Sequence, residues 1–281
     1  MSANVSFYIP AYNAEKTIEK SIQSVLNQTL KAKEIIIIDD NSYDKTSEII
    51  SRYNQIKLIK NQTNLGLGHN RNLAISESKY DIVASIDADV ELEKDWLSIL
   101  LKNLNQNNII MCGGQMIEKY VQLPTNAWRA KYYSQNWGKK DVINPQFLFG
   151  CNTVLNKKYW EKVNGYDEKL KTNGEDINFS NKLKSISNIK LFYSSGAKCY
   201  HLQNDTLETL SDRIWRYHSY GYKIKKPSVL KLIKLTIKQF RFLIIRIFEN
   251  LIKKNLNFIY ISFIIFIKFL KNEVINLLKN K

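Results

Sequence analysis

The sequence predicts an α/β fold in which helices flank a mostly parallel central sheet, followed by a helical tail of different character. Its first half alternates short apolar segments with segments whose apolar residues recur at helical spacing. One apolar segment, EIIIID at 34–39, is a continuous β-branched run, which is typical of a strand buried on both faces. Charge separates the tail: residues 1–222 carry 28 basic and 24 acidic side chains, whereas residues 223–281 carry 14 and 2.

The predicted elements follow one another in a regular order. Strands are expected at 5–9, 34–39, 56–60 and 80–86, and helices at 14–28, 45–54, 69–78 and 95–105. In the first helix, Ile18, Ile22 and Val25 share one face. Repeats of this length imply parallel strands joined by right-handed crossovers, with helices on both faces of the sheet.

Composition excludes several classes of protein. The chain has 281 residues, of which 44% are hydrophobic and 24% charged, as in an ordinary folded protein with one large domain or two modest ones. Its three cysteines show no metal-ligand spacing, so neither a zinc site nor a disulfide framework is expected. The first residues lack the pattern of a signal peptide, and a cytoplasmic protein is expected.

Polar segments follow each predicted strand: PAYN at 10–13, DDNSYDKT at 39–46, NQTNLGLGHNRN at 61–72 and DAD at 87–89. Each of them alone is an ordinary turn. The carboxyl ends of parallel strands meet at one edge of a sheet, where ligands of such folds bind. Asp87 and Asp89 are like charges that need a positive partner there. The glycines of GLGHNR lack the third glycine of a dinucleotide site, which leaves phosphate contact and simple helix entry as alternatives.

These motifs together resemble family 2 glycosyltransferases of the GT-A fold, over roughly residues 4 to 222. The segments that carry the resemblance are VSFYIPAYNAEKTIEKSIQSVLNQT, EIIIIDDNSYDKT, NLGLGHNRN and DIVASIDADV, followed by FLFGCNTVLNKKYWEKVNGYDEKL and NGEDINFSNKL. The resemblance implies a domain at 1–226, with a nucleotide-sugar half at 1–115 and an acceptor half at 116–226. It implies an enzyme, a hexosyltransferase that acts in polysaccharide biosynthesis.

The resemblance also implies roles for individual residues. Asp89 would bind a divalent cation, Mn²⁺ or Mg²⁺, Asp87 would contact the ribose or the metal through water, and His201 would complete the metal shell. A structural histidine and an acidic turn are the alternatives. The nucleotide would contact Pro10, Ala11, Tyr12 and Asn13, one of Asp39 and Asp40, and Asn70 and Arg71. Turn residues at Asn13 and Asp40 and a surface arginine at 71 remain open alternatives.

Catalysis is expected at NGEDINF, where a helix begins. The resemblance makes Asp176 the general base that deprotonates the acceptor hydroxyl, with Glu175 in support, and it implies inversion at the sugar. Helix capping is the alternative role for these two acids.

The tail, residues 227–281, reads as a basic amphipathic region that associates with a membrane. Lys231, Lys234, Lys238 and Arg241 form one charged stripe on an otherwise apolar helix. The apolar run 258–267 has about half of the ~20 residues that a membrane span requires. We therefore expect peripheral attachment to the cytoplasmic face of the membrane, with helix-mediated oligomerisation as the alternative.

The partners predicted from the sequence are a UDP-, GDP- or dTDP-sugar donor, a glycan or lipid-linked acceptor and the membrane surface. Nucleic acid is not expected, because the basic residues alternate with aliphatic ones rather than with base-stacking aromatics. The sequence does not set the oligomeric state. Two other functions stay open: a nucleotidyltransferase-like enzyme on a similar sheet, and a non-catalytic sugar- or membrane-binding relative.

Overall fold

The computed structural model describes residues 2–220, 222 and 227–278. The chain forms two compact units: residues 1–119 with 135–203, and residues 120–134 with 204–281. The predicted boundary at residue 226 and the last three residues of the predicted tail lie outside the described residues. The predicted functional division at residues 115 and 226 stays a prediction.

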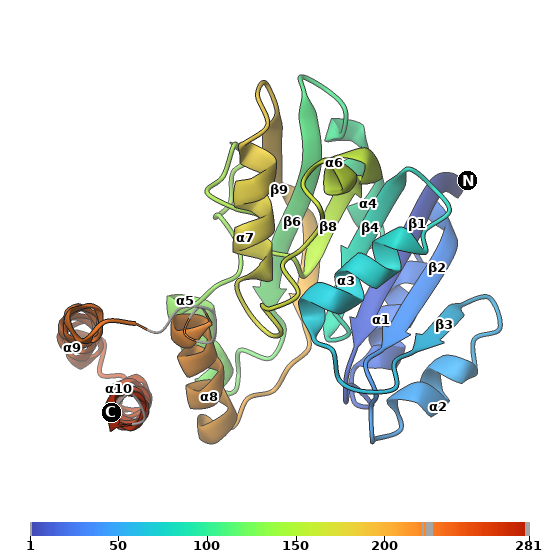
Figure 1. The fold of residues 1–281 in the computed structure, drawn as a ribbon. Helices are drawn as coiled ribbons and strands as arrows, with labels where there is room; N and C mark the ends of the chain where they lie inside the picture. The colour runs from blue at the N-terminus through green and yellow to red at the C-terminus, as the bar shows by residue number, and fades with distance from the viewer. Residues whose placement is uncertain (1, 221, 223–226, 279–281) are drawn as a thin grey trace. The chain divides into compact units, whose positions relative to one another are not determined.

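One mixed sheet forms the centre of the first unit (Figure 1). Its strands lie in the order β3-β2-β1-β4-β8-β6-β9-β5, and β7 pairs with β9. The strands are β1 Ser2–Ala11, β2 Lys31–Asp39, β3 Lys57–Lys60, β4 Ile82–Ile86, β5 Val90–Leu92, β6 Ile109–Glu118, β7 Val142–Ile143, β8 Asn152–Asn156 and β9 Lys190–His201.

The α/β fold with helices around a central sheet is confirmed, but the sheet is parallel over only part of its width. β1 runs parallel to both β2 and β4, and β2 runs parallel to β3. β8 then enters antiparallel between β4 and β6, and β5 and β7 are antiparallel to β9. The strand–helix repeats of the first half therefore produce the expected parallel pairs. β6 and β9 are again parallel to each other, and the antiparallel strands β5, β7 and β8 make the sheet mixed.

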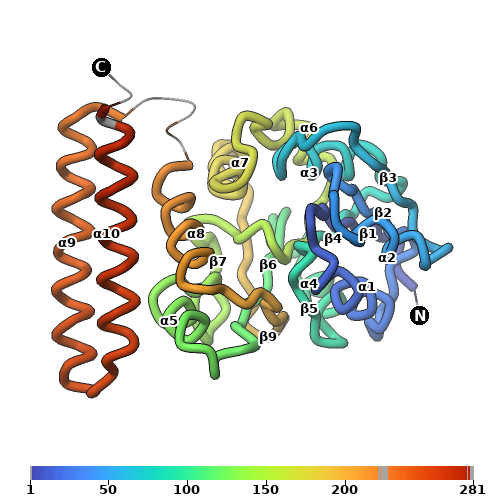
Figure 2. The backbone as a smooth tube through the Cα atoms, turned by 90° about the horizontal axis from the view of Figure 1, so that it is seen from below, coloured from blue at the N-terminus to red at the C-terminus, as the bar shows by residue number. Residues whose placement is uncertain are grey.

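Helices cover both faces of this sheet, as Figure 2 shows. One apolar core contains Ile18, Ile50 and Trp96, from three helices on one face. The other core contains Ala74 and Phe179, from helices on the opposite face. The first set is α1 Ile18–Leu26, α2 Thr46–Ser51 and α4 Trp96–Asn103, and the second is α3 Leu67–Ser76, α6 Lys157–Lys162 and α7 Glu175–Lys184.

Strand register brings the polar segments to one edge of the sheet. Ala11 at the end of β1 pairs with Asp39 at the end of β2, and Asp39 pairs with Lys60 at the end of β3. β4 ends at Ile86, one residue before Asp87. The segments that follow β1, β2 and β4 therefore leave the sheet at the same edge.

The second unit is helical. Trp128, Leu210, Ile214, Phe258 and Ile265 belong to one buried cluster. They come from α5 Pro124–Tyr132, α8 Leu207–Ser219 and α10 Leu256–Leu278, and the remaining helix, α9 Val229–Ile252, packs along α10. Within the described residues, no helix has the length and apolar character to cross a membrane.

Candidate active site

Arg71 is the centre of a buried charge cluster in the first unit. Its side chain is 1% exposed, so the alternative of a surface arginine is wrong. Nη2 donates to Asp87 Oδ1 at 2.8 Å and Nη1 donates to Ser85 Oγ at 3.0 Å. Nε lies 3.6 Å from Glu175 Oε1 and has no hydrogen-bond partner. The positive neighbour that Asp87 needs is therefore supplied within the protein.

The carboxyl groups around Arg71 outnumber its single charge. Burial raises the pKa of Glu175 to about 8, and the neighbouring Asp176 adds to the shift. Burial also raises the pKa of Asp176 and of Asp87, although Arg71 acts in the opposite direction on both. Burial is the largest cause of all three shifts, because removal of a carboxylate from water disfavours its charged form.

Asp176 is fixed at the start of α7 by backbone amides. Gly150 N–H donates to Asp176 Oδ2 at 3.1 Å, and Ile177 N–H donates to Oδ1 at 2.8 Å. A Cβ atom at residue 150 would lie 3.0 Å from Arg71 Nη2 and 3.2 Å from Asp176 Cβ. Glycine at position 150 thus allows its backbone to approach both side chains closely.

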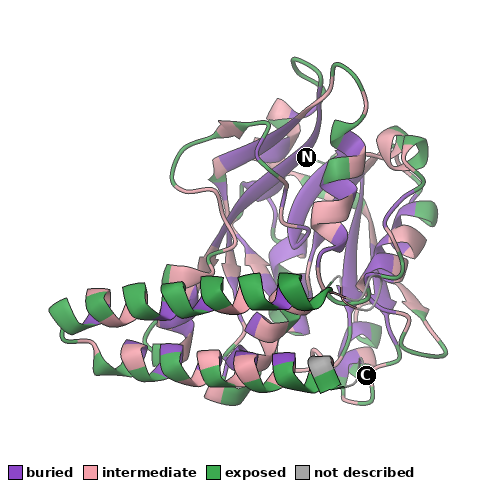
Figure 3. Cartoon of the chain, turned by 60° about the vertical axis from the view of Figure 1, so that its left-hand side comes forward, coloured by how far each residue is buried: buried purple, intermediate pink, exposed green. Residues whose placement is uncertain are grey.

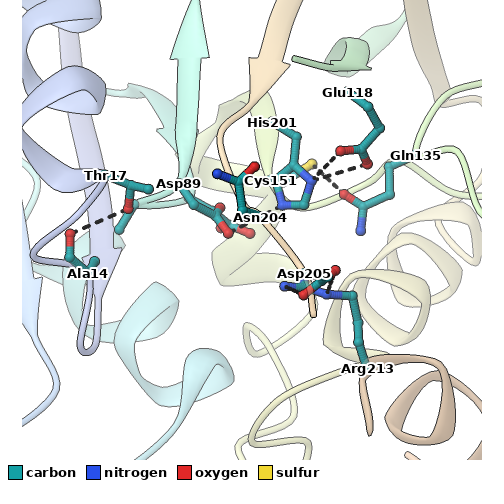
Figure 4. A network of polar contacts seen from close by, with 12 residues as sticks. Ala14, Thr17, Asp89, Glu118, Gln135, Cys151, His201, Asn204, Asp205 and Arg213 are labelled. Atoms are coloured by element: carbon teal, nitrogen blue, oxygen red, sulfur yellow. Dashed lines mark hydrogen bonds and ion pairs between the residues drawn. The ribbon is translucent and has the colours of Figure 1, made fainter. Parts of the chain in front are cut away.

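Asp89 and His201, with Glu118, form a second group of charged side chains in the first unit. Asp89 Oδ2 lies 3.3 Å from His201 Nε2, and the two oxygens of Glu118 lie 3.0 and 3.1 Å from Nδ1 (Figure 4). Burial lowers the pKa of His201, but Asp89 and Glu118 together raise it above its usual value. Nδ1 thus donates to a carboxylate while Nε2 faces Asp89, as in metal sites where a carboxylate orients the histidine.

The Asp89–His201 pair fits a divalent cation. Two neighbouring ligands of an octahedral ion at about 2.1 Å stand about 3 Å apart, close to the 3.3 Å observed. Within the described residues, no three His, Cys, Asp or Glu side chains form a ready-made cluster. Two protein donors would leave positions for phosphate oxygens and water. Asp87, which already binds Arg71, would act beside the ion rather than as its main ligand.

Asp40 and Asn70 have structural partners. Asp40 is buried, and its two oxygens accept the N–H groups of Leu65 and Gly66 at 2.8 Å. Asn61 Nδ2 donates to both Asp40 Oδ1 and Asn70 Oδ1. These contacts hold the loop between β3 and α3. They favour the structural alternative at Asp40, and they make Asp39 the better of the two candidates for contact with a base.

Residues 10–13 lie directly beside Asp39. Pro10 and Ala11 are the last residues of β1, and Tyr12 is 47% exposed beyond them. Asp39 is buried and accepts the Ser42 N–H at 3.0 Å through Oδ1. The register of β1 and β2 therefore brings together the residues expected to hold the nucleotide.

Glu118 is the site residue that the sequence did not reveal. It is the last residue of β6, and its side chain is 6% exposed beside His201. An isolated glutamate in MIEKY carries no motif, and only the parallel pairing of Glu118 with His201 in β6 and β9 identifies it.

Comparison with known proteins identifies the family. Residues 6–163 match the family model described as glycosyl transferase family 2. The chain belongs to glycosyl transferase family 2. Family 2 proteins similar to it include the chondroitin synthase of Escherichia coli, 27% identical over 193 residues, or 66% of this chain and 27% of that protein. Another is the GalNAc(5)-diNAcBac-PP-undecaprenol beta-1,3-glucosyltransferase of Campylobacter jejuni, 28% identical over 60% of this chain and 59% of that one.

Solved structures agree with the family 2 assignment at the level of the fold. The mannosyltransferase PcManGT of Pyrobaculum calidifontis, solved with GDP-Man and Mn²⁺, aligns with a TM-score of 0.61 and 15% identity. The alignment covers 96% of this chain and 87% of the mannosyltransferase. The chain spans about three fifths or less of the length of the two curated relatives above. The matched family and the Campylobacter jejuni relative are both named as enzymes that transfer a glycosyl group.

Proposed function

We propose that this chain moves a sugar from a nucleotide diphosphate to a hydroxyl group of a glycan or lipid-linked acceptor, with inversion and with Asp176 as the general base. The observation that carries the proposal is the position of Asp176. Gly150, whose N–H donates to Asp176, lies against Arg71, and Arg71 holds Asp87. One buried cluster thus contains the fixed carboxylate of Asp176 together with Arg71 and Asp87, and Asp87 belongs to the same motif as Asp89.

The donor would lie along the edge formed by β1, β2 and β4. Asp39 would accept a hydrogen bond from the base, and Pro10, Ala11, Tyr12 and Asn13 would line the base and ribose. Asp89 and His201 would hold Mn²⁺ or Mg²⁺, which supplies charge neutralisation to the departing diphosphate. Arg71 would act through Asp87, because its guanidinium is buried and already engaged.

In the reaction, the acceptor oxygen forms a bond to the anomeric carbon as the bond from that carbon to the diphosphate oxygen breaks. The diphosphate leaves with the electron pair, and the hydroxyl proton passes to Asp176. The raised pKa of Asp176 suits this task, because a carboxylate of higher pKa is a stronger base. Glu175, with a pKa of about 8, would keep its proton near neutral pH and leave Asp176 as the charged member.

The test is Asp176→Asn, assayed for sugar transfer and for nucleotide-sugar binding. We expect turnover to fall about 10²- to 10⁴-fold while the dissociation constant of the donor changes less than about threefold. Asp81→Asn, at an exposed position before β4, is the matched control. Full turnover in Asp176→Asn would show that another group is the base.

We further propose that the second unit attaches the enzyme to a membrane. Figure 3 shows exposed residues along the helices, and on α9 and α10 many of these residues are large and apolar. They extend along most of the length of both helices. On α10 they are Leu256, Tyr260, Phe263, Ile267, Val274, Ile275 and Leu278, and on α9 they include Leu230, Ile233, Ile237, Phe240, Ile244, Phe248 and Leu251. A surface of this kind marks a membrane or protein contact.

Charge favours an anionic bilayer as the occupant. Lys231, Lys234, Lys238 and Arg241 are exposed on α9 and lie next to its apolar face by helical spacing. Each basic residue near an anionic leaflet contributes about 1 kcal/mol. A helix with this division of faces lies in the plane of the interface. The cytoplasmic leaflet is the expected location.

Flotation of the full chain with vesicles tests the attachment. Binding is expected to phosphatidylglycerol-containing vesicles, to weaken with salt, and to be lost in Phe248→Asp/Phe263→Asp. Ile143→Asp is the control, because Ile143 is 61% exposed on β7 in the first unit. If the chain forms dimers and does not bind vesicles, the apolar faces pair with a second copy instead.

A further inference from the structure

Tyr43 is the most exposed large apolar side chain in the first unit, with 85% of its surface accessible. It follows β2 in the segment DDNSYDKT and touches the ring of Tyr12. The two ring centroids lie 6.2 Å apart with the ring planes at 86°. Two exposed aromatic rings thus meet at the edge of the sheet where Asp39 ends β2.

The backbone that carries the two rings is fixed. Tyr43 N–H donates to Asn13 Oδ1 at 3.1 Å, and Asn13 N–H donates to Ser42 Oγ at 3.0 Å. Asn13 and Asn41 both adopt left-handed backbone conformations, with φ of 49° and 64°. Asparagine tolerates this region better than most residues. The loops after β1 and β2 are therefore held together by side-chain and backbone hydrogen bonds, with Tyr12 and Tyr43 projecting from them.

The same loops have further links. Ala14 N–H donates to Thr46 Oγ1 at 2.7 Å, and Glu15 N–H donates to Asp44 Oδ2 at 3.1 Å. These links use only backbone atoms and short polar side chains, so the Tyr43 ring takes no part in them. An exposed ring alone is ordinary on a protein surface, but this ring lies against a second exposed ring, Tyr12, on a loop that directly follows Asp39.

We infer that Tyr43, together with Tyr12, forms an aromatic clamp for the nucleobase of the donor, with Tyr43 as its outer side. This inference rests on the proposed function. Asp39, one residue before the loop, offers the base a hydrogen-bond acceptor, and the two rings offer it stacking surface. The Tyr43 ring can turn about its own side-chain torsions, because most of its surface is accessible and its ring contact is with Tyr12. Every base has a face that can stack, so the clamp increases affinity for the nucleotide as a class rather than selecting one base.

The clamp makes a specific prediction about which part of the ligand is affected. Removing the ring takes away stacking and leaves the diphosphate contacts untouched. The loss of affinity should therefore be the same factor for a nucleoside monophosphate as for the diphosphate. Inorganic pyrophosphate with Mn²⁺ should bind as it does to the wild-type chain.

The experiment measures binding by calorimetry to the full chain in three forms: wild type, Tyr43→Ala and Tyr43→Phe. The monophosphates and diphosphates of uridine, guanosine and deoxythymidine, and pyrophosphate, serve as ligands. With the nucleotide that binds best, we expect Tyr43→Ala to weaken the monophosphate and the diphosphate by about 5- to 150-fold. Tyr43→Phe should stay within about threefold of wild type. Ile143→Ala, also at an exposed apolar position of the first unit, is the matched control.

The outcomes distinguish failure of the proposed function from failure of the aromatic clamp. If the wild type binds no nucleotide, the proposed function fails and the clamp fails with it. If the wild type binds a nucleotide and Tyr43→Ala binds it equally well, the clamp alone is wrong. If Tyr43→Ala loses pyrophosphate as strongly as UDP, the ring supports the loop rather than the base, which also overturns the clamp.

Discussion

His218 in the second unit is a histidine whose contacts require the neutral ring. Gln239 Nε2 and Tyr133 Oη both lie 3.2 Å from His218 Nε2. An amide nitrogen can only donate, so Nε2 must accept and the ring proton must be on Nδ1. Protonation of Nε2 would break the Gln239 bond and place a charge beside Lys238 and Arg246.

These surroundings shift the titration of His218. Burial and the positive charges of Lys238 and Arg246 lower its pKa from 6.5 to about 4. The unfolded chain therefore takes up a proton near pH 6.5, whereas the folded chain does so only near pH 4. Stability is fully present above pH 6.5 and falls as the pH decreases toward 4. This shift corresponds to about 3 kcal/mol at most, and partial solvent exposure reduces the expected loss to about 2–3 kcal/mol.

The perturbation is His218→Gln, which keeps a neutral acceptor and removes the titration. Hydrogen exchange of the α10 amides, corrected for the intrinsic pH dependence of exchange, gives the local free energy of opening in each chain. The variant should be less stable than the wild type at pH 7, because it loses ring packing against Phe269. Between pH 7 and pH 4, the free energy of opening of the wild type should fall by about 2–3 kcal/mol relative to that of the variant.

His69→Gln is the control, since His69 lies in the first unit and pairs with Glu168 on the surface. It should leave the pH dependence of α10 unchanged. An NMR titration of the His218 ring gives the pKa directly and should locate it near 4. A stability difference between wild type and His218→Gln that stays constant from pH 7 to pH 4 would refute the reasoning.

Three further changes test other parts of the molecule. Asp205→Asn should cost about 3–5 kcal/mol in urea unfolding, because it removes the buried carboxylate charge that pairs with Arg129, whereas Asp212→Asn at the half-exposed pair with Lys268 should cost less than about 1. Gly114→Ala should cost about 3 kcal/mol in thermal unfolding, because a Cβ there would lie 2.5 Å from Asn152 Oδ1, while Gly196→Ala has room and should be nearly neutral. Glu118→Gln should weaken Mn²⁺ affinity about 10- to 100-fold without affecting nucleotide binding in EDTA, and an unchanged Mn²⁺ affinity would contradict its orienting role.

The first half of the fold could be predicted from local pattern. Strands and helices from β1 to α4 alternate there, and each carries its own periodicity. The exception is β5, three residues long, which exists because Val90 and Leu92 pair with β9. The later strands depend on such distant partners, and β6 and β9 carry glycines and polar residues within them. Their pairing is a property of the packed sheet, which local sequence does not encode.

The tail illustrates the same limit. The apolar run 258–267 suggests a short interfacial or re-entrant segment, but it lies inside the longer helix α10 Leu256–Leu278. One side of α10 packs into the core around Trp128, where Ser262 accepts a hydrogen bond from the indole N–H at 2.8 Å. The sequence shows that residues 258–267 are almost entirely apolar. It does not show which side of α10 packs into the core and which side stays exposed.

The sequence predicts the part of the site that carries a motif, but it does not predict the contacts that distant residues make with that motif. Asp87 and Asp89 are visible as a pair, and the sequence correctly raises the question of their positive partner. The structure gives two different answers, because Asp87 faces the buried Arg71 and Asp89 faces His201. Burial raises the pKa of Asp87, Glu175 and Asp176, and Arg71 opposes the shift at each of them. The two aspartates of one motif therefore have different partners, and both partners come from segments distant in the sequence, which the spacing of the motif does not reveal.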